Sequence, residues 1–213
     1  PLAKPGSNIS LIPYVGGNYD QTFLEEIDEE MTRVGQDPNF NFNAGADAKV
    51  ALTPGLNLDL TVNPDFSQVE VDEQQLDLSR FELFFPERRQ FFLENSDLFG
   101  TFGDQRANPF FSRRIGIGED TLTGERVQIP ILGGARLSGK LDNNWRVGLL
   151  NMQTRKDIRT GPGYNYTAAS LQRKLFSRSY IGAIFVNKQT FDDMSADTSG
   201  TFNPYNRVLG LEY

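Results

Sequence analysis

The chain has 213 residues, no cysteine, no histidine and a formal net charge of −7. These counts exclude disulfide frameworks, thiolate chemistry, histidine-centred catalysis and most zinc or haem sites, so we expect no cofactor and no metal site. The acidic balance leaves no broad basic face for nucleic acid, and no run of apolar residues is long enough for a transmembrane helix.

Alternation of apolar and polar residues predicts about eight β-strands. It is strictest over residues 41–63, where Phe42 to Val50 and then Leu56 to Val62 alternate with Asn, Asp, Lys and Thr. The predicted strands are 8–19, 41–52, 56–63, 131–141, 145–152, 164–175, 180–188 and 205–213. Most are longer than the strands usual in soluble sheets and are close to the length that crosses a bilayer as a tilted strand.

Connections of two lengths alternate along the chain. Tight turns are predicted at 53–55, 142–144 and 176–178, and long polar connections at 20–40, 64–130, 153–163 and 189–204. With antiparallel neighbours, all tight turns fall at one end of the sheet and all long connections at the other, which is typical of outer-membrane barrels. We therefore expect an all-β, antiparallel up-and-down outer-membrane β-barrel, with residues 1–213 forming a single domain or part of one.

The strand faces support this interpretation but leave an alternative open. In 131–141 the predicted apolar face holds Ile131, Ala135, Leu137 and Leu141, opposite Arg136, Ser138 and Lys140. Aromatic residues lie near predicted strand ends, where barrels carry aromatic girdles: Tyr14, Tyr19, Trp145, Tyr164, Tyr166, Tyr180 and Tyr213. The alternative is a soluble β-sandwich with an ordinary apolar core, which the small residues Ala44, Ala46 and Ala48 favour.

The connection over residues 20–37 holds seven carboxylates and one arginine. Such a run is typical of a solvated loop. A short helix over 22–33 is a second interpretation. Cation binding is a minor alternative, because the spacing matches no calcium loop.

The long insert, residues 64–130, differs in kind from the other connections. Residues 77–116 contain nine of the 17 phenylalanines, interleaved with arginines and carboxylates. So many aromatic side chains must pack on something, which in a barrel means a plug or gate whose charges pair with residues of the lumen. The candidate plug or gate residues are Phe81, Glu82, Phe84, Phe85, Glu87, Arg88, Arg89, Phe91, Phe92, Glu94, Asp97, Arg113 and Arg114.

Paired carboxylates in this insert raise the question of catalysis. Glu82 with Glu87, or Glu94 with Asp97, invites a glycosidase interpretation. Each has an arginine within a few residues, so ion pairing is the favoured interpretation. No phosphate-binding loop, Ser/His/Asp set or metal motif accompanies them. We therefore expect no enzymatic activity.

The segment "LTVNPDFSQVEVDEQQLDLSRFELFFPERRQFFLENSDLF" (60–99), the later "FFSRRIG" (110–116) and the preceding hairpin carry a resemblance. They resemble an uncharacterised family of large outer-membrane proteins common in Bacteroidetes. In that family a carbohydrate-binding-module-9-like domain commonly precedes a C-terminal β-barrel domain of unknown function. The resemblance implies a location in the outer membrane of a Gram-negative bacterium and brings no catalytic residues. Because family members look longer, we expect the chain to be the first part of a wider barrel.

The leading functional prediction is a barrel in the lipid bilayer that passes or handles a ligand, either a glycan or a polypeptide, with the insert as plug or gate. One alternative is a non-conducting structural subunit that docks to other envelope proteins. The other is a soluble β-sandwich binding module.

Overall fold

The computed structural model describes residues 8–20, 23–25, 33–35, 39–64, 87, 89–103, 108–121, 123–124, 126–176, 179–192 and 202–213. Its main element is an eight-stranded sheet in the order β1-β4-β5-β8-β9-β10-β11-β12. These strands are β1 (Ile9–Asp20), β4 (Asn39–Thr53), β5 (Leu56–Val62), β8 (Ile131–Lys140), β9 (Trp145–Thr154), β10 (Asn165–Lys174), β11 (Tyr180–Gln189) and β12 (Tyr205–Glu212). Two short hairpins pair β2 (Phe23–Glu25) with β3 (Arg33–Gly35), and β6 (Ile117–Glu119) with β7 (Arg126–Gln128).

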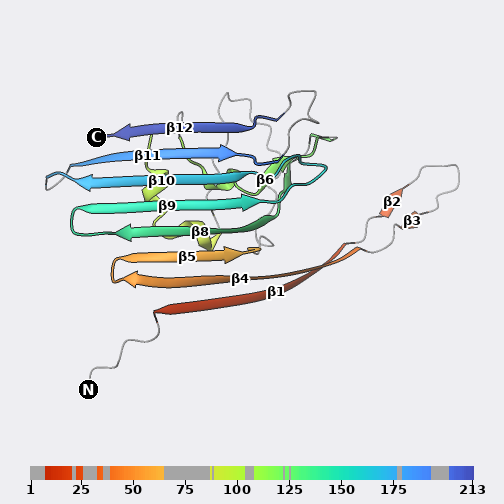
Figure 1. The fold of residues 1–213 in the computed structure, drawn as a ribbon. Coiled ribbons are helices and arrows are strands. Elements are labelled where there is room, and N and C mark those ends of the chain that lie inside the picture. The colour runs from red at the N-terminus through yellow and green to blue at the C-terminus, as the bar shows by residue number, and fades with distance from the viewer. Residues whose placement is uncertain are drawn as a thin grey trace, which may run out of the picture.

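The antiparallel, up-and-down arrangement of the sheet is confirmed. All neighbouring strands pair antiparallel. The tight turns lie at one end of the sheet and the long connections at the other (Figure 1). Within the described residues the sheet is open, with β1 and β12 at its two edges, so it forms no closed barrel.

Two local expectations are wrong. The helix considered over 22–33 does not form where that segment is described, because Phe23–Glu25 and Arg33–Gly35 pair as strands that follow on from β1 and β4. Ile131 does not share a face with Ala135 and Leu137. A register shift between Ile131 and Gly133 turns Ile131 to the opposite face, where only 1% of it is exposed. An extra residue at a bulge changes which face the preceding side chains take. A prediction that assumes strict alternation along the strand therefore assigns Ile131 to the wrong face.

The described part of the insert packs on one face of the sheet, which we call the covered face. It contributes α1 (Gln90–Leu93), α2 (Asp97–Gly100) and the 3-10 turn η1 (Ser112–Arg114), and α2 contacts β9 and β10. The buried core therefore combines insert and sheet residues: Phe92, Leu98, Phe99 and Ile115 with Ile131, Leu150, Met152 and Ala168.

Two glycines of the covered face allow the insert to approach the sheet closely. A Cβ atom on Gly148 of β9 would lie 2.7 Å from the ring of Phe99. One on Gly182 of β11 would lie 3.0 Å from the ring of Phe102. Each ring therefore occupies space that any other residue at the glycine position would fill.

The other face of the sheet, which we call the open face, is largely apolar and uncovered in the described residues. Its exposed side chains include Leu11 and Val15 of β1, Phe40 and Phe42 of β4, and Leu209 and Leu211 of β12. Toward the long connections the open face of β9–β11 becomes polar, where Asn151 donates hydrogen bonds to Asn165 and Thr167, both at 2.9 Å.

The aromatic residues near strand ends are divided between the two faces of the sheet. By the strand register, Tyr19 and Trp145 lie on the open face, whereas Tyr14, Tyr166 and Tyr180 lie on the covered face. Tyr213 follows β12 and is exposed. Tyr164, just before β10, is buried, and its hydroxyl donates to the Asn203 carbonyl at 3.1 Å. Their positions near strand ends could not reveal which face each side chain takes.

Candidate functional site

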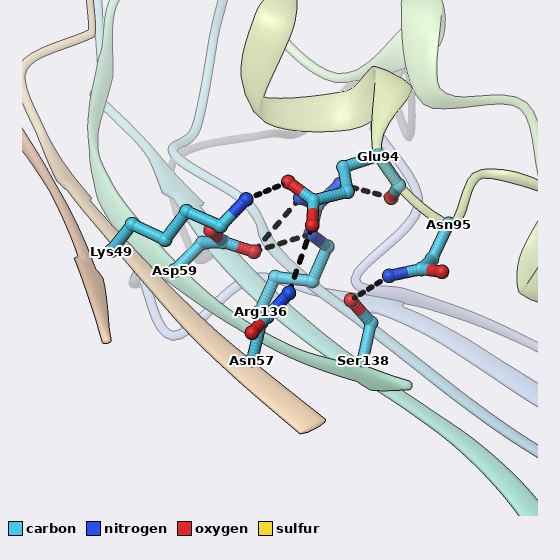
Figure 2. Close-up of polar contacts among 7 residues, drawn as sticks. All are labelled: Lys49, Asn57, Asp59, Glu94, Asn95, Arg136 and Ser138. Atoms are coloured by element: carbon cyan, nitrogen blue, oxygen red, sulfur yellow. Dashed lines mark hydrogen bonds and ion pairs between the residues drawn. The ribbon is translucent and has the colours of Figure 1, made fainter. Parts of the chain in front are cut away.

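The contact between the insert and the covered face is centred on Glu94, which follows α1. Its carboxylate forms an ion pair with Lys49 of β4 and accepts a hydrogen bond from Asn57 of β5 at 2.9 Å. The next residue, Asn95, donates to Ser138 of β8 at 3.1 Å. Figure 2 shows the strand side chains pointing toward this corner of the insert. Three strands therefore hold one turn of the insert, and we call this set the Glu94 cluster.

Arg136 lies at the centre of the Glu94 cluster. Its guanidinium pairs with Asp59 of the neighbouring strand at 2.8 Å, and both residues are buried. It also donates to the Glu94 carbonyl at 2.7 Å and lies over the Phe91 ring, 5.2 Å from its centroid. Its charge is thus balanced within the sheet while its remaining donors bind the insert.

A second ion pair joins the insert to the sheet at α2. Asp97 lies 2.6 Å from Arg146 of β9, which in turn reaches Gln172 of β10 at 3.4 Å. Both members are partly exposed. We expect this pair to contribute less stability than the buried contact of Arg136.

The third group of contacts lies within the insert itself. Arg89 binds Glu87 through two nitrogen–oxygen contacts, at 2.8 and 2.7 Å. It also donates to the backbone carbonyls of Ser112 and Ile115, each at 2.6 Å, and the Ser112 hydroxyl donates to Glu87. The guanidinium lies 4.2 Å from the Phe92 ring centroid. This Arg89 network joins residues 87–89 of the insert to residues 112–115, and a bidentate guanidinium fixes their relative orientation.

The electrostatics favour the charged forms of Glu94 and Glu87. The hydrogen bond from Lys49 lowers the pKa of Glu94, against an opposing effect of burial. Burial alone would raise the pKa of Glu87, but its hydrogen bonds and ion pair with Arg89, together with the Ser112 hydroxyl, bring the net shift below the ordinary value. A general acid at neutral pH needs the opposite shift, so these carboxylates are suited to structural ion pairing.

A cavity of about 1130 Å³ lies beside these contacts, at the end of the sheet that carries the long connections. Its wall includes η1 and β6 of the insert and the ends of β10–β12. Within the described residues no group of three or more acidic side chains is placed to hold a metal ion. No helix of that part of the chain is long and apolar enough to cross a membrane.

The family model for a domain of unknown function, DUF5916, matches residues 5–195. The chain belongs to this family. The match covers the insert and seven of the eight strands of the main sheet. Neither the curated proteins nor the solved structures contain a match.

The structure brings some of the predicted site residues of this DUF5916 domain together. Glu94 and Asp97 reach the sheet, whereas Glu87 and Arg89 pair with each other. Phe92 lies in the core with Phe91 packed against it, and Arg113 and Arg114 line the cavity. Phe81, Glu82, Phe84, Phe85 and Arg88 lie outside the described residues. The role of the set as plug or gate stays a prediction.

Sequence reasoning did not identify the sheet residues that bind the insert. Lys49, Arg136 and Arg146, and Asp59 that pairs with Arg136, were visible as the polar side of alternating strands. Their partners are distant along the chain, however; Asp59 and Arg136 are 77 positions apart. The sequence signal that could have found them is the charged residues on the polar side of consecutive strands. Such charges must either contact water or pair with other charges, so they mark a face that can bind the insert.

Proposed function

We propose that this domain forms part of the wall of an outer-membrane β-barrel, with the open face toward lipid and the insert on the lumen side. A soluble antiparallel sheet buries its apolar face and exposes its polar face. Here a largely apolar face is exposed instead, and charged and polar residues are buried on the covered face beside its apolar core around Leu150 and Met152. The covered face buries Asp59, Arg136 and Gln172, while Leu11, Phe42 and Leu209 on the open face are 67%, 68% and 73% exposed.

The exposed apolar face is the observation that carries the proposal. Apolar surfaces of this extent mark contact with a membrane or another protein, and a barrel wall has an apolar outer band and a polar interior. The hydrogen-bonded polar residues around Asn151 and Asn165 then mark where the lipid band ends, on the side of the long connections. Further strands would pair with the open edges β1 and β12 and close the wall.

The proposed role is the passage or handling of a ligand, a glycan or a polypeptide, with the insert as plug or gate. The family resemblance supports an envelope location in Bacteroidetes beside a carbohydrate-binding module. A non-conducting structural role is the second candidate. It is favoured by the number of polar contacts that fix the insert to the sheet, because a plug held in this way has little freedom to move.

The absence of cysteine permits a direct test with single spin labels. Leu149→Cys and Asn151→Cys place labels on the same strand and the same face, two residues apart, one in the apolar part of the open face and one in its polar end. In lipid vesicles we expect the label at 149 to be accessible to oxygen and shielded from a water-soluble nickel chelate. The label at 151 should be more accessible to the chelate.

Electrophoresis of boiled and unboiled full-length chain in SDS provides an independent check, because a closed barrel resists SDS until heated. Solubility without detergent, no binding to vesicles and equal chelate access at 149 and 151 would contradict the membrane proposal. They would favour a β-sandwich instead.

A further inference from the structure

The cavity of about 1130 Å³ at the long-connection end of the sheet has a charge balance unlike that of the whole chain. Its lining includes the cations Arg113, Arg114, Arg126 and Lys188 and the carboxylates Glu119 and Asp120. Asp120 already pairs with Arg159 at 2.7 Å. Among these lining cations, Lys188 has no carboxylate partner in the described part of the chain, which favours an anionic occupant.

Lys188 of β11 is the best-placed cation for such an occupant. Its ammonium lies 4.0 Å from the Tyr164 ring centroid and 5.7 Å from that of Tyr166. Among the described residues it has neither a carboxylate partner nor a hydrogen-bond acceptor. Arg114 lines the same cavity, and its positive charge disfavours the charge on Lys188. An anionic group between Lys188 and Arg114 would offset this repulsion and supply the acceptor that Lys188 lacks.

A second unsatisfied group points to the rest of the ligand. The hydroxyl oxygen of Thr160 is buried, lines the same cavity and has no hydrogen-bond partner in the described structure. Leaving a buried hydroxyl without a partner is unfavourable. The lining also includes the amide side chains of Asn108, Asn203 and Asn206 and the rings of Tyr164 and Tyr166. Hydroxyl, amide and aromatic groups together are suited to a polyhydroxylated molecule.

We propose that this cavity binds a hydroxyl-bearing organic anion, a sugar acid or a sugar phosphate. Its anionic group would lie between Lys188 and Arg114, and one of its hydroxyl groups would bind Thr160. The cavity volume exceeds the space that one hexose fills, so a short anionic saccharide also fits. The inference rests on the proposed function for the idea that the protein handles a ligand, and it assigns that ligand a chemical class.

Calorimetric titration of the full chain in detergent tests the assignment. The probes are glucuronic acid and glucose 6-phosphate, with glucose and inorganic phosphate as controls. We expect saturable binding of at least one anionic sugar, at least about tenfold tighter than either control. Binding of glucuronic acid alone identifies a carboxylate ligand, and binding of glucose 6-phosphate alone identifies a phosphate ligand.

Variants locate the site. Lys188→Gln, which keeps the length of the side chain, should weaken binding by about tenfold or more, and Thr160→Val should weaken it by a smaller factor. Lys174→Gln, at an exposed position near the opposite end of β10, is the matched control and should bind as the wild type does.

Three results would each overturn the assignment: no saturable binding of either anionic sugar, unchanged binding by Lys188→Gln, or phosphate binding as tightly as the sugars. None of these results alters the spin-label measurement on β9. Failure of the ligand assignment is therefore distinguishable from failure of the membrane proposal.

Discussion

Arg136 and Asp59 lie side by side on β8 and β5, with a guanidinium nitrogen 2.8 Å from a carboxylate oxygen, and the same guanidinium donates to the Glu94 carbonyl of the insert. One buried cation therefore connects two strands and the insert. The sheet and the insert share this interaction, so neither part is fully paired without the other.

The first prediction follows from this sharing. Arg136→Met should lower the free energy of unfolding by about 3–5 kcal/mol, because it leaves the Asp59 carboxylate buried without its partner. Denaturant unfolding in detergent measures the change. Arg146→Met is the matched control, since its partly exposed pair with Asp97 should contribute at most about 1 kcal/mol. Equal losses for the two variants would contradict the central role of Arg136.

The second prediction concerns pH. The pKa of Glu94 is lower in the folded protein than its ordinary value of 4.5, chiefly through the hydrogen bond from Lys49. A lowered pKa means that the stabilising contribution is complete above the ordinary value and is lost as pH falls through the folded value. We therefore expect the insert to loosen from the sheet below about pH 4.5 and not between pH 6 and 8. The lowered pKa of Glu87 adds a loss in the same acidic range.

Distances between spin labels at Thr101→Cys in the insert and Leu149→Cys in the sheet would report this loosening. Glu94→Gln is the control, because an amide does not titrate and should reduce the acid-dependent part of the change. An identical acid transition in wild type and Glu94→Gln would assign the effect to other carboxylates.

The third prediction concerns the contact between Phe99 and Gly148. Gly148→Ala places a methyl group where the Phe99 ring lies, 2.7 Å from the nearest ring carbon, so we expect a loss of about 1–3 kcal/mol in unfolding free energy. Phe99→Leu in the same chain should recover part of that loss. Gly16→Ala, with no atom within 4 Å of the added carbon, serves as the control and should have little effect. Additive effects of the two changes would show that the ring and the glycine do not interact.

The fourth prediction separates a moving gate from a fixed plug. Asn95 and Ser138 join the insert to β8 through one hydrogen bond. Cysteines at these two positions, bridged by a short bifunctional thiol reagent, would hold the insert in place. If the insert moves, the bridge should abolish ligand-induced conductance in planar bilayers, and the singly substituted variants treated with the same reagent should keep it. Unchanged conductance after bridging would exclude a gate at this contact.

The sequence by itself determined the eight strands and their order. Alternation is a local property of each strand, and the short turns at 53–55 and 142–144 force neighbouring strands into antiparallel pairs. The observed strands differ from the predicted ones by only a few residues at their ends. The sequence also showed that Lys49, Asp59 and Arg136 lie on the polar sides of their strands, because polar residues recur there at every second position.

The tertiary structure alone decided which charges meet and where the alternation fails. Lys49 and Glu94 are 45 positions apart, and their meeting depends on how the insert folds back on the sheet. The bulge at Ile131 and the inward positions of Tyr164 and Tyr166 depend on register and packing, which local patterns do not encode. The cavity near Lys188 likewise arises only when distant segments come together, because each segment contributes only one part of its wall.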